Sequence, residues 1–270
     1  MKKLIINLVF ELAAVYLTVV GLVIVFQRHL MYYPTQEWTA NPAQHNITVV
    51  KYPTADGLTL TSWYVPPQGD KPVFVLFHGN AKNISSWVSV PDYFTKLGYG
   101  FLLAEYRGYG GNAGSPSEQG FYKDGRAAMT WLMKDQKIPE NKIIVYGMSI
   151  GSGTASEMAF EYKDIKALVL EAPLTSAANE AGDVYPWLGP FRYLVFDKFD
   201  NISKAPSFRM PVIVLQGSAD EVIPPTHGKA LFDAVGSPVK KYILLPGGHH
   251  NDLRDFGLFQ DIESFISNLK

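Results

Sequence analysis

A serine flanked by glycines is the first feature of this chain that could carry chemistry. Residues 147–151 read Gly-Met-Ser-Ile-Gly. A serine with a glycine two positions away on each side is typical of a very tight turn from a strand into a helix, which holds the hydroxyl exposed for attack. The context agrees, because residues 142–146 favour a strand and residues 150–162 favour a helix. We therefore interpret Ser149 as a nucleophile rather than an incidental turn serine.

A serine hydroxyl needs a neighbouring base, and three histidines follow Ser149 in the chain. His227 stands at the start of a predicted helix, which favours a surface or capping position. His249 and His250 follow the predicted strand 242–245 and a Pro-Gly-Gly turn. A loop in that place can carry an imidazole over the serine. The residues alone leave both neighbours open as the base.

The carboxylate that would orient this imidazole is expected after the preceding strand, 212–215. Asp220 is the first candidate, and Glu221 is the alternative beside it. An aspartate in such a turn often serves only as a cap or a turn hydrogen bond. Its place between the serine and the histidines favours the catalytic interpretation.

An oxyanion intermediate needs backbone N–H donors, and two loops can supply them. One donor is Ile150, at the start of the helix after the nucleophile. The other is Asn80, in the loop that follows the predicted strand 73–77. His78 in the same loop is interpreted as a structural residue at the strand end.

The elements that must position these residues alternate along the chain. A hairpin around Asp56-Gly57 comes first, and the continuous apolar run 73–77 then indicates a strand buried on both faces. Further strands are predicted at 99–104, 142–146, 167–170, 212–215 and 242–245, and helices at 84–97, 120–134, 150–162, 226–235 and 252–269. This order predicts an α/β fold with a mostly parallel central sheet and helices on both faces.

The alternation fails between residues 174 and 209, where aromatic residues and prolines gather. We interpret this stretch as a short cap inserted after a strand, with ordinary helix packing as the alternative. Seven large apolar residues within a dozen positions cannot all be buried in a small insertion. Part of the cap is therefore expected to line an apolar cleft beside Ser149.

The N-terminus reads as a membrane anchor. Residues 4–26 are almost wholly apolar, and about 20 such residues cross a bilayer as a helix. A cleaved signal peptide or a helix packed on a partner are the alternatives. Lys2 and Lys3 weakly favour the catalytic domain on the non-cytoplasmic side. The predicted division is an anchor helix at 1–28, a linker at 29–46 and a catalytic domain at 47–270.

Composition excludes several classes of function. The chain has 270 residues, a net charge of −1 and no cysteine. A charge near zero gives no attraction to nucleic acid. The lack of cysteine excludes disulfides, cysteine-ligated zinc and a thiol nucleophile. No metal or cofactor is implied, and the expected partners are the membrane and a small or lipid-like acyl substrate.

Six segments in order resemble the small, membrane-anchored abhydrolase-domain branch of the α/β-hydrolase superfamily, over about residues 45–268. They are His-Gly-Asn-Ala at 78–81, Tyr-Arg-Gly-Tyr-Gly at 106–110, Gly-Ser-Pro-Ser at 114–117, the serine motif at 147–151, Gly-Ser-Ala-Asp-Glu-Val-Ile-Pro at 217–224 and His-Asn-Asp at 250–252. The branch includes lipases and protein depalmitoylases. Its His-Asn-Asp ending selects His250 as the base. Asn112 departs from the pattern, in which a serine or threonine is common there.

The resemblance implies hydrolysis of an ester or thioester by Ser149, Asp220 and His250. A serine peptidase of the same fold and a non-catalytic membrane-bound scaffold are the alternatives. The chain shows no large accessory domain that would select peptides, which counts against a peptidase. The presence of all three triad residues counts against a scaffold.

Overall fold

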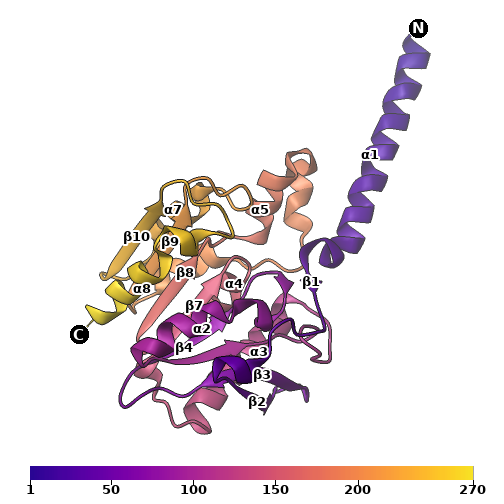
Figure 1. Cartoon of the computed structure of the whole chain (residues 1–270). Helices are drawn as coiled ribbons and strands as arrows, with labels where there is room; N and C mark the ends of the chain where they lie inside the picture. Colours follow the sequence, from indigo (N-terminus) through magenta and orange to yellow (C-terminus); the bar gives the residue numbers. More distant parts are fainter. Residues whose placement is uncertain (270) are drawn as a thin grey trace.

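An eight-stranded sheet forms the centre of the protein, as seen in a computed structural model that describes residues 1–269 (Figure 1). The strand order is β10-β9-β8-β7-β4-β6-β3-β2; the pairs from β10 to β6 are parallel, and β3 is antiparallel to both β6 and β2. The strands are β2 (Thr48–Pro53), β3 (Thr59–Val65), β4 (Val73–Phe77), β6 (Gly100–Ala104), β7 (Ile143–Met148), β8 (Ala167–Glu171), β9 (Val212–Gly217) and β10 (Lys240–Leu245). The predicted mostly parallel sheet is confirmed. The last residue of the predicted catalytic domain, Lys270, lies outside the described range.

Helices cover both faces of this sheet. Side chains alternate across a strand, so Val73, Val75 and Phe77 of β4 face one core, while Phe74 and Leu76 face the other. Helices α3 (Glu118–Lys134), α4 (Gly151–Glu161) and α7 (Pro225–Ala234) cover the first core, and α2 (Ser89–Phe94) and α8 (Leu258–Ser267) cover the second. Short 3-10 helices lie at Ile84–Trp87, Thr95–Leu97, Glu140–Lys142 and Leu253–Phe256. All five residues of β4 are buried, which explains its unbroken apolar sequence.

The N-terminal helix α1 runs from Lys2 to Met31 and projects away from the domain (Figure 1). It is the one helix in residues 1–269 that is long and apolar enough to cross a membrane. It extends three residues beyond the predicted boundary at 28. The segment that follows is not a free linker, because β1 (Tyr33–Pro34) pairs in parallel with β5 (Ala81–Lys82).

The rest of this segment also packs on the domain. A 3-10 helix spans Pro42–His45, and the ring of Trp38 lies 5.0 Å from that of Trp63. Tyr32 is buried, whereas Tyr33 is half exposed. The aromatic residues after α1 therefore serve mainly to fix the helix to the domain.

The segment between β8 and β9 forms a small projection over the carboxyl ends of the strands. It contains α5 (Ala177–Val184) and a 3-10 helix at Pro186–Leu194 that is kinked at Gly189. We call residues 177–196 the cap. The remaining residues of the predicted insertion behave differently. Helix α6 (Asn201–Lys204) and the 3-10 turn Ala205–Ser207 pack on the main core, where Phe199 and Phe208 are fully buried.

Candidate active site

Three side chains meet at the carboxyl ends of β7, β9 and β10. The hydroxyl oxygen of Ser149 lies 3.1 Å from Nε2 of His250, and Nδ1 of His250 lies 2.9 and 3.1 Å from the two carboxylate oxygens of Asp220. Because an ionised carboxylate only accepts, Nδ1 carries the proton and Nε2 accepts from the serine hydroxyl. All three residues are buried. The structure thus brings together the three residues predicted as a triad.

A strained turn presents Ser149 at the end of β7. Its φ of 53° lies in the left-handed region, which is costly for a serine. The two flanking glycines make the turn possible. A methyl group at Gly147 would lie 2.5 Å from Cβ of Ala155, and one at Gly151 would collide with the carbonyl oxygen of Phe77. Any larger residue at either glycine would force the turn open.

Asp220 is held as an acceptor by its own loop. Its carboxylate accepts from the backbone amides of Val222 at 2.9 Å and Ile223 at 2.8 Å, and from the side-chain amide of Gln216 at 2.8 Å. These donors fix the direction of the carboxylate. The alternative acid, Glu221, is exposed and points to His249 instead.

His249 and His250 have opposite surroundings. His249 is exposed, and its Nδ1 lies 2.9 Å from the carboxylate of Glu221, which raises the pKa of the imidazole. His250 is buried between Ser149 and Asp220. The geometry therefore singles out His250, the neighbour that the resemblance selects.

The loop after β4 lies against Ser149. A methyl group at Gly79 would contact Cβ of Ser149 at 3.6 Å, and Asn80 and Ile150 both border the pocket above the serine. Asn80 is fixed from several sides. Its side-chain amide donates to the carbonyl oxygen of Met31 at 3.0 Å, and its own carbonyl accepts from the amide of Tyr33. The position of this loop depends on the end of α1, a contact that the sequence did not reveal.

His78 holds the same loop from below. It is buried, with Nε2 2.8 Å from the carboxylate of Glu105 and Nδ1 2.8 Å from the carbonyl oxygen of Gly79. Glu105 also accepts from the amide of Ile84 at 3.0 Å. These contacts agree with the predicted structural role of His78.

Comparison with known proteins shows the family to which the chain is related. A family model described as the alpha/beta hydrolase fold matches residues 72–201, and one described as serine aminopeptidase, S33, matches residues 200–256. A Mycobacterium tuberculosis protein is 36% identical over 84% of this chain and 81% of its own length. The Arabidopsis thaliana alpha/beta hydrolase domain-containing protein WAV2 is 30% identical over 86% of this chain and 84% of its own.

The chain belongs to the α/β-hydrolase family. The predicted resemblance and fold class are therefore confirmed. Among solved structures, an esterase of Pyrococcus furiosus superposes with a TM-score of 0.74 over 88% of this chain and 98% of that one. At 18% identity, this likeness describes the fold alone.

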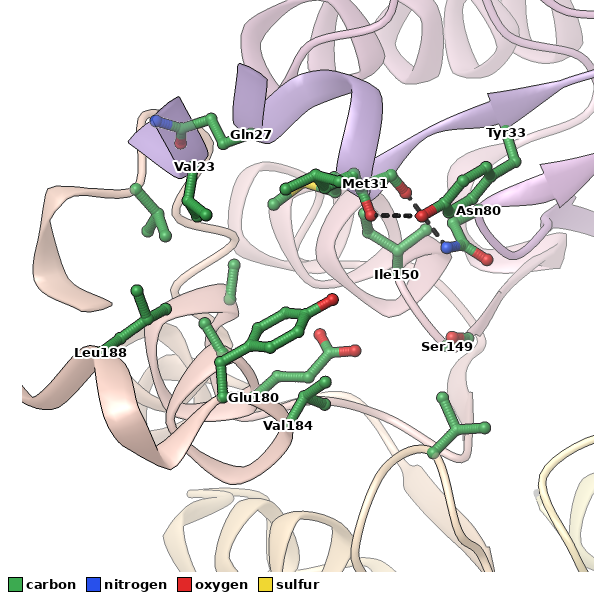
Figure 2. Close-up of a pocket in the computed structure, with 16 residues that line it drawn as sticks. Val23, Gln27, Met31, Tyr33, Asn80, Ser149, Ile150, Glu180, Val184 and Leu188 are labelled. Atoms are coloured by element: carbon green, nitrogen blue, oxygen red, sulfur yellow. Dashed lines mark hydrogen bonds between the residues drawn. The ribbon is translucent and has the colours of Figure 1, made fainter. Parts of the chain in front are cut away.

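A pocket of about 280 Å³ opens above Ser149 in this α/β-hydrolase (Figure 2). That volume is at the small end for ligand pockets. Most of the lining is apolar. Cap residues Ala177, Ala181, Val184, Tyr185 and Leu188 form one side, and α1 residues Val23, Gln27, Leu30 and Met31 form another. The contribution of the cap was expected, whereas that of α1 was not, because a run of apolar residues carries no signal of which domain surface it meets.

Glu180 on α5 provides the one carboxyl group among the described residues that line the pocket, and Figure 2 shows it within the cavity. Burial raises the pKa of this carboxyl to about 7. The field of His250 lowers the pKa, while Asp220 and Asp183 raise it. Glu180 could not be identified from the sequence, because it occupies an ordinary polar position in an amphipathic segment.

The surface or capping position predicted for His227 is wrong. The residue lies in the first turn of α7 but is buried. Its Nδ1 accepts from the amide of Thr175 at 3.0 Å, and its Nε2 lies 2.7 Å from the carboxylate of Asp183 on the cap. His227 therefore joins the cap to the main domain, because the helix start faces inward beneath the insertion.

Proposed function

We propose that this α/β-hydrolase is a serine hydrolase that cleaves carboxylic esters or thioesters of apolar acyl groups. The observation that carries the proposal is the chain of contacts from Ser149 through His250 to Asp220, placed at the base of an apolar pocket. A buried hydroxyl paired with a buried, carboxylate-oriented imidazole is the arrangement that activates a serine for acyl transfer.

The first half of the reaction forms an acyl-enzyme. The hydroxyl oxygen of Ser149 attacks the acyl carbonyl carbon while Nε2 of His250 takes the proton. Asp220 stabilises the imidazolium that results. The tetrahedral intermediate then collapses, the bond to the leaving alkoxide or thiolate breaks, and His250 returns the proton to that leaving group.

The second half releases the acyl group. A water molecule gives a proton to Nε2 of His250 and attacks the acyl-enzyme carbonyl. Collapse of the second intermediate returns the proton to the oxygen of Ser149 and frees a carboxylic acid. In both halves the backbone amides of Asn80 and Ile150 stabilise the oxyanion, assisted by the N-terminus of α4, where Ile150 is the N-cap.

The apolar lining supports an acyl substrate. Each methylene group buried in such a pocket contributes about 0.8 kcal/mol, so catalytic efficiency should rise with chain length until the pocket is full. Amides should react much more slowly than esters, because an amine is a poorer leaving group. The triad itself does not distinguish an ester from a thioester.

A membrane location forms part of the proposal. Helix α1 can cross a bilayer by length and composition, and it joins the domain without a flexible linker. We propose a single-pass anchor, with the catalytic domain on the non-cytoplasmic side because Lys2 and Lys3 favour retention of the N-terminus in the cytoplasm.

A peptidase activity is the second candidate, favoured by the family match over residues 200–256. That segment contains Asp220 and His250, which an esterase of this fold would also place after the nucleophile. The apolar lining of the pocket favours an ester substrate over a peptide substrate.

A series of p-nitrophenyl esters tests the proposal on the full-length protein in detergent micelles. We expect kcat/KM to rise from acetyl to medium-chain esters, and aminoacyl p-nitroanilides to be poor substrates. Ser149→Ala should lose on the order of 10⁴–10⁶ in kcat. Ester hydrolysis that persists in this variant, or a preference for the anilides, would contradict the proposal.

A further inference from the structure

Helix α1 is a wall of the substrate pocket as well as an apolar segment. Val23, Gln27 and Met31, one turn apart, face the pocket together with Leu30 (Figure 2). By contrast, Val25 is 69% exposed on another face of the same helix. One face of α1 therefore meets the active site, while another is free to meet lipid.

Polar contacts fix this part of α1 to the last residue of the cap and to Asp197, which follows the cap. The buried side chain of Gln27 accepts from the amide of Phe196 at 2.6 Å. The next residue, Arg28, donates two hydrogen bonds to Asp197, at 2.8 and 3.1 Å, and Tyr32, four residues further on, donates a third at 3.1 Å. Since Asp197 is buried, these bonds hold the helix at a defined angle to the pocket.

The cap also reaches along the apolar part of α1. The hydroxyl of Tyr16 donates to the carbonyl oxygen of Trp187 at 2.9 Å. Tyr16 lies eleven residues before Gln27, which is about 16 Å along a helix. The cap surface around this contact exposes large apolar side chains, namely Val184, Tyr185, Trp187, Tyr193, Leu194 and Phe196. A membrane-spanning α1 would place this surface at the depth of the lipid chains.

We propose that a fatty acyl chain passes directly from the bilayer leaflet to Ser149, between α1 and the cap. The occupant is the acyl chain of a membrane-held ester or thioester, so the inference rests on the proposed function and narrows its substrate class. Exposing an acyl chain to water costs free energy for every methylene group, and such a route avoids this exposure. The anchor helix then determines specificity, and the exposed cap residues sit in the leaflet.

Paired substitutions on α1 test this route in phosphatidylcholine vesicles. Val23→Trp fills the pocket wall, and Val25→Trp places the same residue on the exposed face of the helix. We expect V23W to lower kcat/KM for vesicle-bound p-nitrophenyl palmitate by at least about tenfold. The ratio of palmitate to acetate activity of V23W should therefore fall below that of the wild type, and V25W should leave both esters unaffected. Equal effects of the two variants on the palmitate would overturn the proposal.

A smaller pair of variants guards against misfolding. If V23W does not react with the fluorophosphonate, Val23→Ala replaces it as the test variant, because alanine removes apolar contact with the substrate without causing a clash. It should lower the ratio of palmitate to acetate activity by about threefold to tenfold, and Val25→Ala should not. An unchanged ratio in V23A overturns the proposal. If the wild type hydrolyses neither ester, it is the proposed function that fails.

The depth of the cap has its own readout, independent of activity. Helix α1 contains no tryptophan, and Trp187 is 45% exposed. Brominated phosphatidylcholine should therefore quench the fluorescence of the wild type more strongly than that of Trp187→Phe. Identical fractional quenching in the two proteins would place the cap outside the leaflet and overturn the proposed route.

Discussion

Adjacent residues of the same chemical type differ sharply in burial and contacts in this site. His250 and Asp220 are buried and in contact, whereas His249 and Glu221 form a second, exposed pair beside them. Residue type alone could not separate these pairs. The separation comes from the two loops, whose successive side chains point to opposite sides.

The two histidines should differ sharply in their effect on catalysis. His250→Ala removes the base, and we expect a loss on the order of 10⁴–10⁶ in kcat. His249→Ala removes only an exposed ion pair, and its activity should stay close to that of the wild type. Steady-state kinetics of both variants on one medium-chain ester measures this difference in kcat. The reverse pattern would transfer the role of base to His249.

Glu180 should make stability depend on pH. Its folded pKa of about 7 lies above the usual 4.5 of a glutamate, so the folded state holds the proton more tightly and stability falls as pH rises from about 4.5 to about 7. Glu180→Gln removes this effect. Its stability relative to the wild type should therefore increase between pH 5 and pH 8, by up to about 3 kcal/mol.

Thermal unfolding in detergent micelles at several pH values measures this difference. Glu37→Gln, at an exposed position, is the matched control. A difference between E180Q and the wild type that stays constant with pH would show that the carboxyl group is already ionised in the folded protein.

Among the helices and strands, the local sequence pattern predicted the strands of the sheet. It did not predict how segments far apart in the sequence pack against one another. The apolar run of β4 was predicted with its observed limits, because burial on both faces leaves an unbroken signal. The single helix expected at 84–97 is instead two 3-10 turns around α2. Apolar spacing alone does not show where such a helix is interrupted.

The contacts that shape the pocket could not be predicted in the same way. The bonds from α1 to Asp197 and Asn80 join residues 49 to 169 positions apart in the chain. Asn112 is a related case. Its side chain pairs with the backbone of Thr61, accepting at 2.8 Å and donating at 3.2 Å, much as a neighbouring strand would. This pairing explains the asparagine at position 112, but it could not be predicted from the sequence, because the two residues come together only when the chain folds.

The loop after β6 should be a sensitive point for stability. Arg107 is buried and donates to the carboxylate of Asp124 at 2.8 Å and to that of Asp56 at 2.9 Å. Arg107→Ala would leave Asp124 buried without its partner, at an expected cost of about 3–5 kcal/mol in unfolding free energy. Lys123→Ala breaks only the more exposed pair with Asp56 and should cost less than about 1 kcal/mol. Equal losses in denaturant unfolding would argue against the buried ion pair.

For the whole molecule, α1 and the domain act as one unit. The helix meets the pocket, the cap and the loop of Asn80, so anchor and active site share residues. In the proposed membrane arrangement, Ser149 lies near the membrane surface and the pocket faces the bilayer. It is a closer coupling than a flexible tether would give.

Membrane fractionation tests the anchor. The full-length protein should stay in the pellet through high-salt and carbonate washes, since burial of about 20 apolar residues does not respond to charge screening. N-terminal sequencing should find the apolar segment intact. Release by carbonate would indicate a peripheral helix, and a mature N-terminus beyond residue 20 would indicate a cleaved signal.

Labelling with a fluorophosphonate probe tests the central claim, that Ser149 is an activated nucleophile. The probe reacts with a serine only where a base and an oxyanion site support the attack. Mass spectrometry of the intact wild type should show a single adduct, mapped by peptide analysis to Ser149, and Ser149→Ala should show none. An adduct that survives in this variant, or one that maps to another serine, would contradict the account.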